Sequence, residues 1–182
     1  MEFTSKFNWI DILAFIVLVR ILYIAVSKGF VVEFFKCIAT FLSLSFSFHY
    51  FTYVTDLLVR FLPFLNENTG YALSLIALYG LVWTLIKYVR TAIILLFKIE
   101  PHAVIERWVG LFLGLARGAV FLSVLFFTLY LFHGRYVNNS LMHSFSFSAV
   151  KQIAPASYRT MCGFYATFLP GLKPNEAVDK VY

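Results

Sequence analysis

The chain has 182 residues, of which 61% are hydrophobic, 20% aromatic and 13% charged, and its formal net charge is +6. Ordinary soluble domains contain about 45–50% apolar and about 25% charged residues. The composition therefore excludes a disordered chain. It also argues against a soluble globular domain, because so few polar residues could not cover so much apolar side chain. The class that remains is an integral membrane protein.

Four stretches are long and apolar enough to cross a bilayer as helices, which takes about 20 residues each. They cover residues 9–26, 30–54, 71–96 and 104–132. A short break at residues 27–29 separates the first two, and no stretch sustains the alternation of a β-barrel strand. We therefore predict an all-α membrane protein with about four transmembrane helices, which form a transmembrane domain over residues 8–132.

Residues 133–182 are less apolar and are predicted to form an amphipathic C-terminal region with a tail. Two segments place apolar side chains at helical spacing: Met142, Phe145, Ala149 and Ile153 in the first, and Tyr158, Met161, Cys162, Tyr165 and Phe168 in the second. Both are too short to span a membrane, so they lie on the bilayer surface or pack onto the bundle. Residues 172–182 are expected to be a frayed tail.

The basic residues near the helix ends predict the orientation, because cytoplasmic loops carry an excess of Lys and Arg. The side of the first and third loops has Lys28, Lys36, Lys87, Arg90, Lys98 and Arg107, whereas the opposite side has Lys6, Arg60 and Arg135. This bias favours cytoplasmic first and third loops. Both termini would then lie outside.

Two arginines, Arg20 and Arg117, fall well inside predicted spans, where an ionisable side chain is expensive and therefore suggests a function. The acidic residues within or beside the spans are Asp11, Glu33 and Glu106. Arg117 could pair with an acid of another helix, line a wet cavity, contact a lipid phosphate or extend toward the interface. Asp11 and Glu33 are the best candidate counter-charges.

Three glycines surround Arg117 at a spacing of four: Gly110, Gly114 and Gly118. This spacing places them on one stripe of a helix, where the backbone of another helix can come very close. The stripe predicts either packing inside the chain or contact with a second copy or a membrane protein partner. Packing inside the chain is the interpretation that we favour.

Two blocks of residues resemble the colicin V production protein (CvpA) family. The first contains Trp9-Ile10-Asp11, Lys28-Gly29-Phe30 and Glu33, and the second is Glu106-Arg107-x-x-Gly110-x-x-x-Gly114-x-x-Arg117-Gly118. Lys28 stands where the family often has Arg, and Glu106 where it often has Asp. The resemblance implies a small protein of the bacterial inner membrane with about four spans. It further implies a part in producing or exporting a secreted peptide toxin and in keeping the cell envelope intact.

Our leading hypothesis is therefore a non-enzymatic membrane protein whose partners are the bilayer and another membrane protein or copy of itself. The alternative is a small oligomeric transporter or channel for an anionic solute, which Arg20 and Arg117 would attract. No hydrolase, metalloprotease or phosphate-loop motif is found, so we expect no enzyme, cofactor or metal site. Cys37 and Cys162 are expected to be buried free thiols rather than a disulfide. Nucleic-acid binding is not expected, because membrane topology accounts for the basic residues.

Overall fold

The computed structural model describes residues 8–62, 66–97, 105–132, 134–168 and 174–179. Within these ranges the chain forms seven helices and no strand. Four helical segments are long and apolar enough to cross a membrane: Trp9–Lys28, Phe30–Phe61, Glu67–Ile93 and Trp108–Leu131. The predicted fold class, an all-α membrane protein with four candidate spans, is therefore confirmed.

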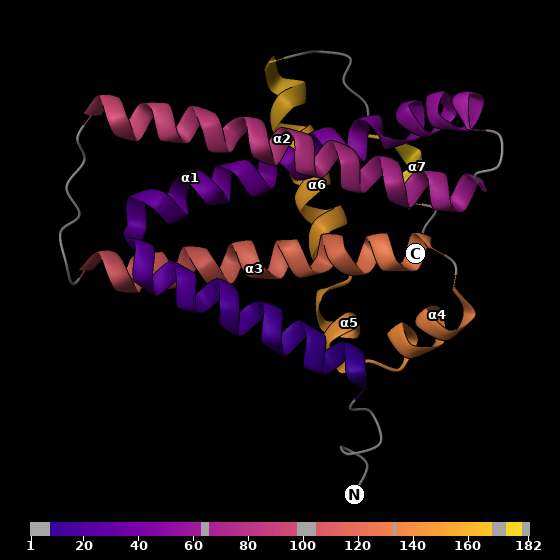
Figure 1. The fold of residues 1–182 in the computed structure, drawn as a ribbon, viewed down its shortest axis with the longest axis horizontal. Helices are drawn as coiled ribbons and strands as arrows, with labels where there is room; N and C mark the ends of the chain where they lie inside the picture. The colour runs from indigo at the N-terminus through magenta and orange to yellow at the C-terminus, as the bar shows by residue number, and fades with distance from the viewer. Residues whose placement is uncertain (1–7, 63–65, 98–104, 133, 169–173, 180–182) are drawn as a thin grey trace, which may run out of the picture.

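Helix α1 (Trp9–Phe61) contains the first two spans. Asn8 caps its start, because the Asn8 side chain bonds the backbone of the first turn while Asp11 accepts from the Asn8 backbone N–H. The helix bends sharply and returns, so its two arms, residues 9–28 and 30–61, form a V (Figure 1). The prediction that the helix is interrupted at residues 27–29 is wrong, because the backbone stays helical through the bend.

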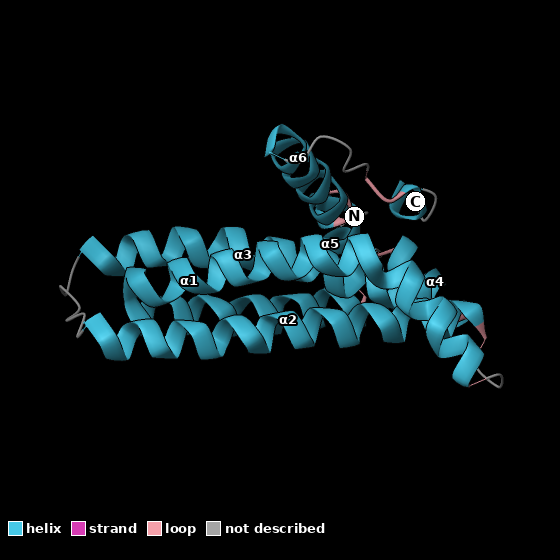
Figure 2. Cartoon of the chain, turned by 90° about the horizontal axis from the view of Figure 1, so that it is seen from above, coloured by secondary structure: helices cyan, strands magenta, loops and turns pink. Residues whose placement is uncertain are grey.

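Helices α2 (Glu67–Phe97) and α3 (Ile105–Leu131) supply the other two spans. Together with the second arm of α1 they run along the long axis of the molecule (Figures 1 and 2). Many large apolar side chains on α1 and α3 face outward, such as Phe15 and Tyr23 on the first arm of α1 and Phe112 on α3, which are 67%, 74% and 70% exposed. An apolar outer surface is what a bilayer requires, because lipid tails surround the bundle there.

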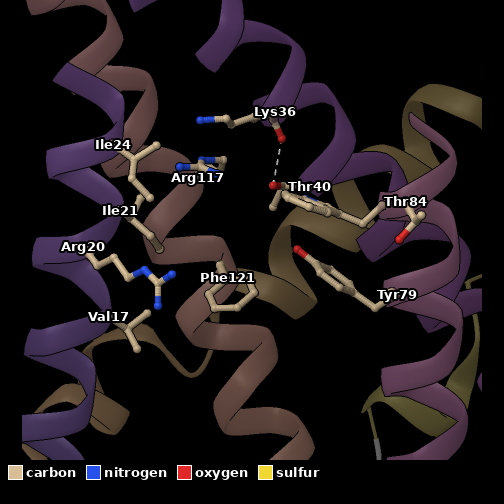
Figure 3. Close-up of a pocket in the computed structure, with 12 residues that line it drawn as sticks. Val17, Arg20, Ile21, Ile24, Lys36, Thr40, Tyr79, Thr84, Arg117 and Phe121 are labelled. Carbon is tan, nitrogen blue, oxygen red and sulfur yellow. Dashed lines mark hydrogen bonds between the residues drawn. The ribbon is translucent and has the colours of Figure 1, made fainter. Parts of the chain in front are cut away.

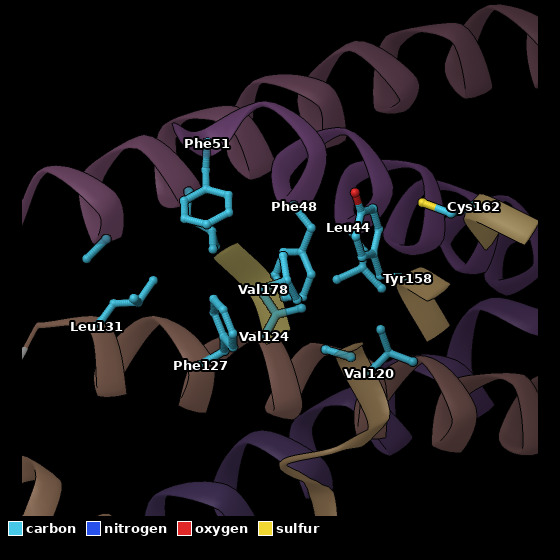
Figure 4. Close-up of a cluster of buried hydrophobic side chains, with 13 residues drawn as sticks. Leu44, Phe48, Phe51, Val120, Val124, Phe127, Leu131, Tyr158, Cys162 and Val178 are labelled. Atoms are coloured by element: carbon cyan, nitrogen blue, oxygen red, sulfur yellow. The ribbon is translucent and has the colours of Figure 1, made fainter. Parts of the chain in front are cut away.

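The main apolar core lies where the second arm of α1 meets α3. Phe48 stacks at a tilt on Phe127, with ring centroids 4.7 Å apart, and Tyr158 meets Phe48 edge-on (Figure 4). Leu44 and Val124 are buried in the same cluster. The core therefore joins the membrane helices to α6 (Ile153–Phe168), which carries Tyr158.

Two short helices, α4 (Arg135–Met142) and α5 (Phe145–Val150), come before α6. The first predicted face does not form on one helix, because Met142 ends α4, Phe145 and Ala149 lie in α5, and Ile153 begins α6; Phe147 is the buried apolar residue of α5. The reason is local: the side chain of Ser144 accepts a bond from the Phe147 N–H and starts a new helix, which shifts the periodicity.

The C-terminal region packs onto the bundle through α6 and α7 (Glu176–Asp179). Tyr158 and Cys162, from the second predicted face, are buried in the main core. The expectation of a frayed tail is wrong for residues 174–179. There the Asn175 backbone N–H donates to the Tyr158 hydroxyl at 3.0 Å, its side chain donates to the Phe48 carbonyl at 3.1 Å, and Val178 is buried.

Candidate functional site

A buried ion-pair cluster joins α1 to α3 inside the membrane-spanning region. Glu33, near the start of the second arm of α1, is fully buried, and Arg117 of α3 is 8% exposed. The Nη2 atom of Arg117 lies 3.0 Å from Oε2 of Glu33. Lys36, one turn further along the same arm, donates to the other carboxylate oxygen of Glu33. One carboxylate therefore serves two cations.

The position of these residues follows from the sequence of each helix. Lys36 lies three residues after Glu33, so both project from one face of α1. Arg117 reaches the same point from α3, and its Nε is buried without a hydrogen-bond partner. A charge pair in a low-dielectric interior persists only when its partners are close and well oriented. The cluster therefore fixes how the second arm of α1 sits on α3.

A cavity of about 710 Å³ lies beside this cluster, between the two arms of α1, α2 and α3. Arg20, Lys36 and Arg117 supply its basic groups, and Thr40 and Tyr79 supply hydroxyls (Figure 3). The Tyr79 hydroxyl is buried without a hydrogen-bond partner and points toward the middle of the cavity. Most of the remaining wall is apolar, with Ile21, Ile24 and Phe121 among the lining residues.

Arg20 contributes from the first arm of α1. Its side chain is exposed overall, yet the guanidinium turns from the helix toward the cavity, near Phe121 (Figure 3). Both ion pairs found within the described residues use Glu33, and no described carboxylate lies within 4 Å of the Arg20 guanidinium. The cavity is thus lined by three formal positive charges, with one carboxylate adjacent.

The glycine stripe of α3 packs against the first arm of α1. A Cβ at Gly114 would lie 2.4 Å from the Ala25 Cβ, and one at Gly118 would lie 3.5 Å from a methyl group of Ile21. Gly110 is buried as well. Gly114 and Gly118 therefore contact α1 of the same chain and are not free to contact another copy.

The remaining predicted charges lie apart from this cluster. The Oδ1 atom of Asp11 accepts from the Ser144 hydroxyl and the Ser146 N–H, both at 2.8 Å, and so holds α5 against the start of α1. Lys28 is exposed at the bend. Glu106 and Arg107 lie in the first turn of α3, and their side chains are outside the described residues. Of the two candidate counter-charges, the structure places Glu33 beside Arg117.

Sequence reasoning missed three contributors to the site: Lys36, Thr40 and Tyr79. Lys36 was counted only as a marker of orientation, although its spacing of three from Glu33 was a signal for an ion pair. Thr40 follows Lys36 by four, and its hydroxyl donates to the Lys36 carbonyl at 2.9 Å. Nothing in the sequence singles out Tyr79, because its role depends on how α2 packs.

The two blocks that carry the family resemblance meet at this site, since Glu33 belongs to the first block and Arg117 to the second. A family model described as colicin V production protein matches residues 10–155. No curated protein and no solved structure matches the chain significantly. Except for Trp9, the matched region holds all four candidate spans together with α4 and α5. The chain belongs to the colicin V production protein family.

Proposed function

We propose that the chain is a non-enzymatic protein of the bacterial inner membrane that supports toxin production or export and envelope homeostasis. The observation that carries this proposal is the ion pair between Glu33 and Arg117. It links the two sequence blocks of the family across two helices. A buried pair at that place is a structural requirement for function, because removing one partner leaves the other charge unpaired in a low-dielectric interior.

The proposed orientation has both termini outside and the α1 bend and the α2–α3 connection in the cytoplasm. Lys28 at the bend and Lys87 on α2 are exposed basic residues on that side, in keeping with the excess of Lys and Arg in cytoplasmic loops. Fusion of a compartment-specific reporter to the C-terminus tests the orientation. A signal from the cytoplasm would contradict it.

Charge exchange at the ion pair tests the role of the site in cells. A strain that lacks the gene receives the wild-type chain, Arg117→Glu, Glu33→Arg or the exchanged double variant. Secreted toxin activity from a supplied colicin V operon and resistance to detergent are then measured. Each single variant should lose both readouts, and the double variant should recover part of them, because the opposite charges again face each other.

Immunoblots of membrane fractions separate loss of function from loss of protein in this experiment. Arg60→Glu is the matched control, since it reverses an exposed charge outside both the ion pair and the cavity. Full function of Arg117→Ala would refute the proposed role of the pair. A wild-type chain that restores neither readout would refute the proposed cellular function.

The second candidate function, an oligomeric transporter or channel for an anionic solute, is favoured by the basic side chains that line the cavity. Chain reconstituted into vesicles should then release a trapped anion faster than empty vesicles do. The release should fall in Arg117→Ala. Equal release from empty vesicles would exclude this candidate.

A further inference from the structure

We propose that the cavity between the arms of α1, α2 and α3 binds the phosphate group of an anionic membrane lipid. This inference goes beyond the proposed function and does not depend on it. Its first support is charge: Arg20, Lys36 and Arg117 line the cavity, and the carboxylate beside them is Glu33. Formally this leaves two positive charges uncompensated. An anion with several acceptor oxygens would offset them, as phosphate does for clustered Arg and Lys.

The unused donors point in the same direction. Arg117 Nη2 forms an ion pair with Glu33 at 3.0 Å, but the Nε of Arg117 is buried without a hydrogen-bond partner, and the Tyr79 hydroxyl is likewise buried and unpaired. Unpaired buried polar groups are uncommon, because each loses its bonds to water without replacement. Both residues line the cavity, so the oxygen atoms of one phosphate group could accept hydrogen bonds from both of them and from Arg20.

The shape and the walls favour a lipid over a free anion. Apolar side chains such as Ile21, Ile24 and Phe121 form much of the lining, which suits an acyl chain below a charged head. On the α2 side, Thr84 is exposed and a Cβ at Gly80 would meet no atom within 4 Å. The cavity is therefore open at the lipid-facing surface of the bundle rather than sealed inside it.

A basic path leads to the cavity from the end of the bundle that holds the α1 bend. Lys36 also lines a narrow crevice together with Lys87 and Arg90 of α2. Lys87 is exposed, whereas the side chains of Lys36 and Arg117 are 11% and 10% exposed, so an anion entering here passes from an exposed cation to two nearly buried ones. Lys36 lies six residues from Phe30, about 9 Å at the rise of an α-helix, so it lies within the leaflet nearer the α1 bend, whose hydrocarbon part is about 15 Å thick.

Native mass spectrometry of the purified full chain tests the proposal directly. The chain is exchanged into micelles with equal amounts of phosphatidylglycerol and phosphatidylcholine, and bound lipid is counted. Wild-type chain should retain the anionic lipid in about tenfold excess, as expected for one or two charge-assisted hydrogen bonds. Arg20→Gln should remove most of that excess. It should still fold, because Arg20 pairs with no described carboxylate. The matched control is Arg60→Gln, at an exposed arginine outside the cavity.

A steric variant separates the cavity from general surface charge. Gly80→Leu adds bulk at the cavity wall without changing charge and should also lose the anionic lipid. Gly163→Leu is its control, since Gly163 of α6 likewise has open space and lies outside the cavity. Equal retention of both lipids, or unchanged retention in Arg20→Gln and Gly80→Leu, would overturn the proposal. Displacement of the lipid by millimolar inorganic phosphate would overturn the lipid as ligand.

Discussion

Replacement of Gly114 by alanine should destabilise the bundle far more than its size suggests. The new Cβ would lie 2.4 Å from the Ala25 Cβ, whereas carbon atoms in contact are about 3.5–4.0 Å apart. The two helices would have to separate by about 1 Å. The Ala25 Cβ cannot rotate away, because it is fixed to the backbone. Overpacking of this kind costs about 1–3 kcal/mol, which a thermal unfolding curve of the chain in detergent can measure.

Two further variants make this prediction sharp. Gly80→Ala is the control, because its Cβ meets no atom within 4 Å, and its unfolding temperature should equal or exceed that of wild type. Gly114→Ala combined with Ala25→Gly removes the opposing methyl group and leaves the Ala25 Cα at 3.9 Å, an ordinary contact. The double variant should therefore recover most of the loss. Wild-type stability in Gly114→Ala, or a double variant no more stable than Gly114→Ala, would refute the reasoning.

Three other predictions concern the C-terminal region. Asp11→Ala removes the acceptor of three hydrogen bonds. It should lower stability in detergent by about 1.5–3 kcal/mol, the range for bonds to a charged group. Tyr158→Phe removes the acceptor of the Asn175 N–H, so exchange of that amide with deuterium should accelerate about tenfold. Burial raises the pKa of the Cys162 thiol, which lowers its thiolate fraction at a given pH. In a folded Cys37→Ala chain, maleimide should therefore label Cys162 much more slowly than in the same chain unfolded in urea, and the labelling rate should rise with pH. Equal labelling rates in the folded and unfolded chains would contradict this.

The spans could be predicted from the sequence because hydropathy reports directly on a bilayer, but the bend in α1 could not. Ser27-Lys28-Gly29 has the composition of a loop. Yet the backbone keeps its helical assignment there. Only Gly29 separates the two candidate spans, which leaves no residues for an open loop, so the chain turns by bending a continuous helix. Composition alone does not distinguish such a bend from a loop.

The ion-pair partners were only partly predictable. The sequence singled out Arg117 and offered Asp11 and Glu33 as acids, but the choice between them depends on how deep each lies once α1 has bent. In the structure, Asp11 accepts a hydrogen bond from Ser144 at the start of α5, whereas Glu33 pairs with Arg117. The prediction of a frayed C-terminal tail was wrong for a similar reason. Asn175 is held by contacts to residues more than 100 positions away in the sequence, such as Phe48.

The glycine stripe and the basic cavity depend on the same helix contact. Gly118 faces Ile21, and Arg117 and Arg20 directly precede these two residues. Neighbouring positions on a helix are rotated by about 100°, so when Gly118 and Ile21 meet, both arginines can turn to the adjoining side of the seam. That side is the cavity that both line. Close approach at the glycines is thus what brings two like charges to one cavity, and a larger residue at position 118 would disturb packing and charge placement together.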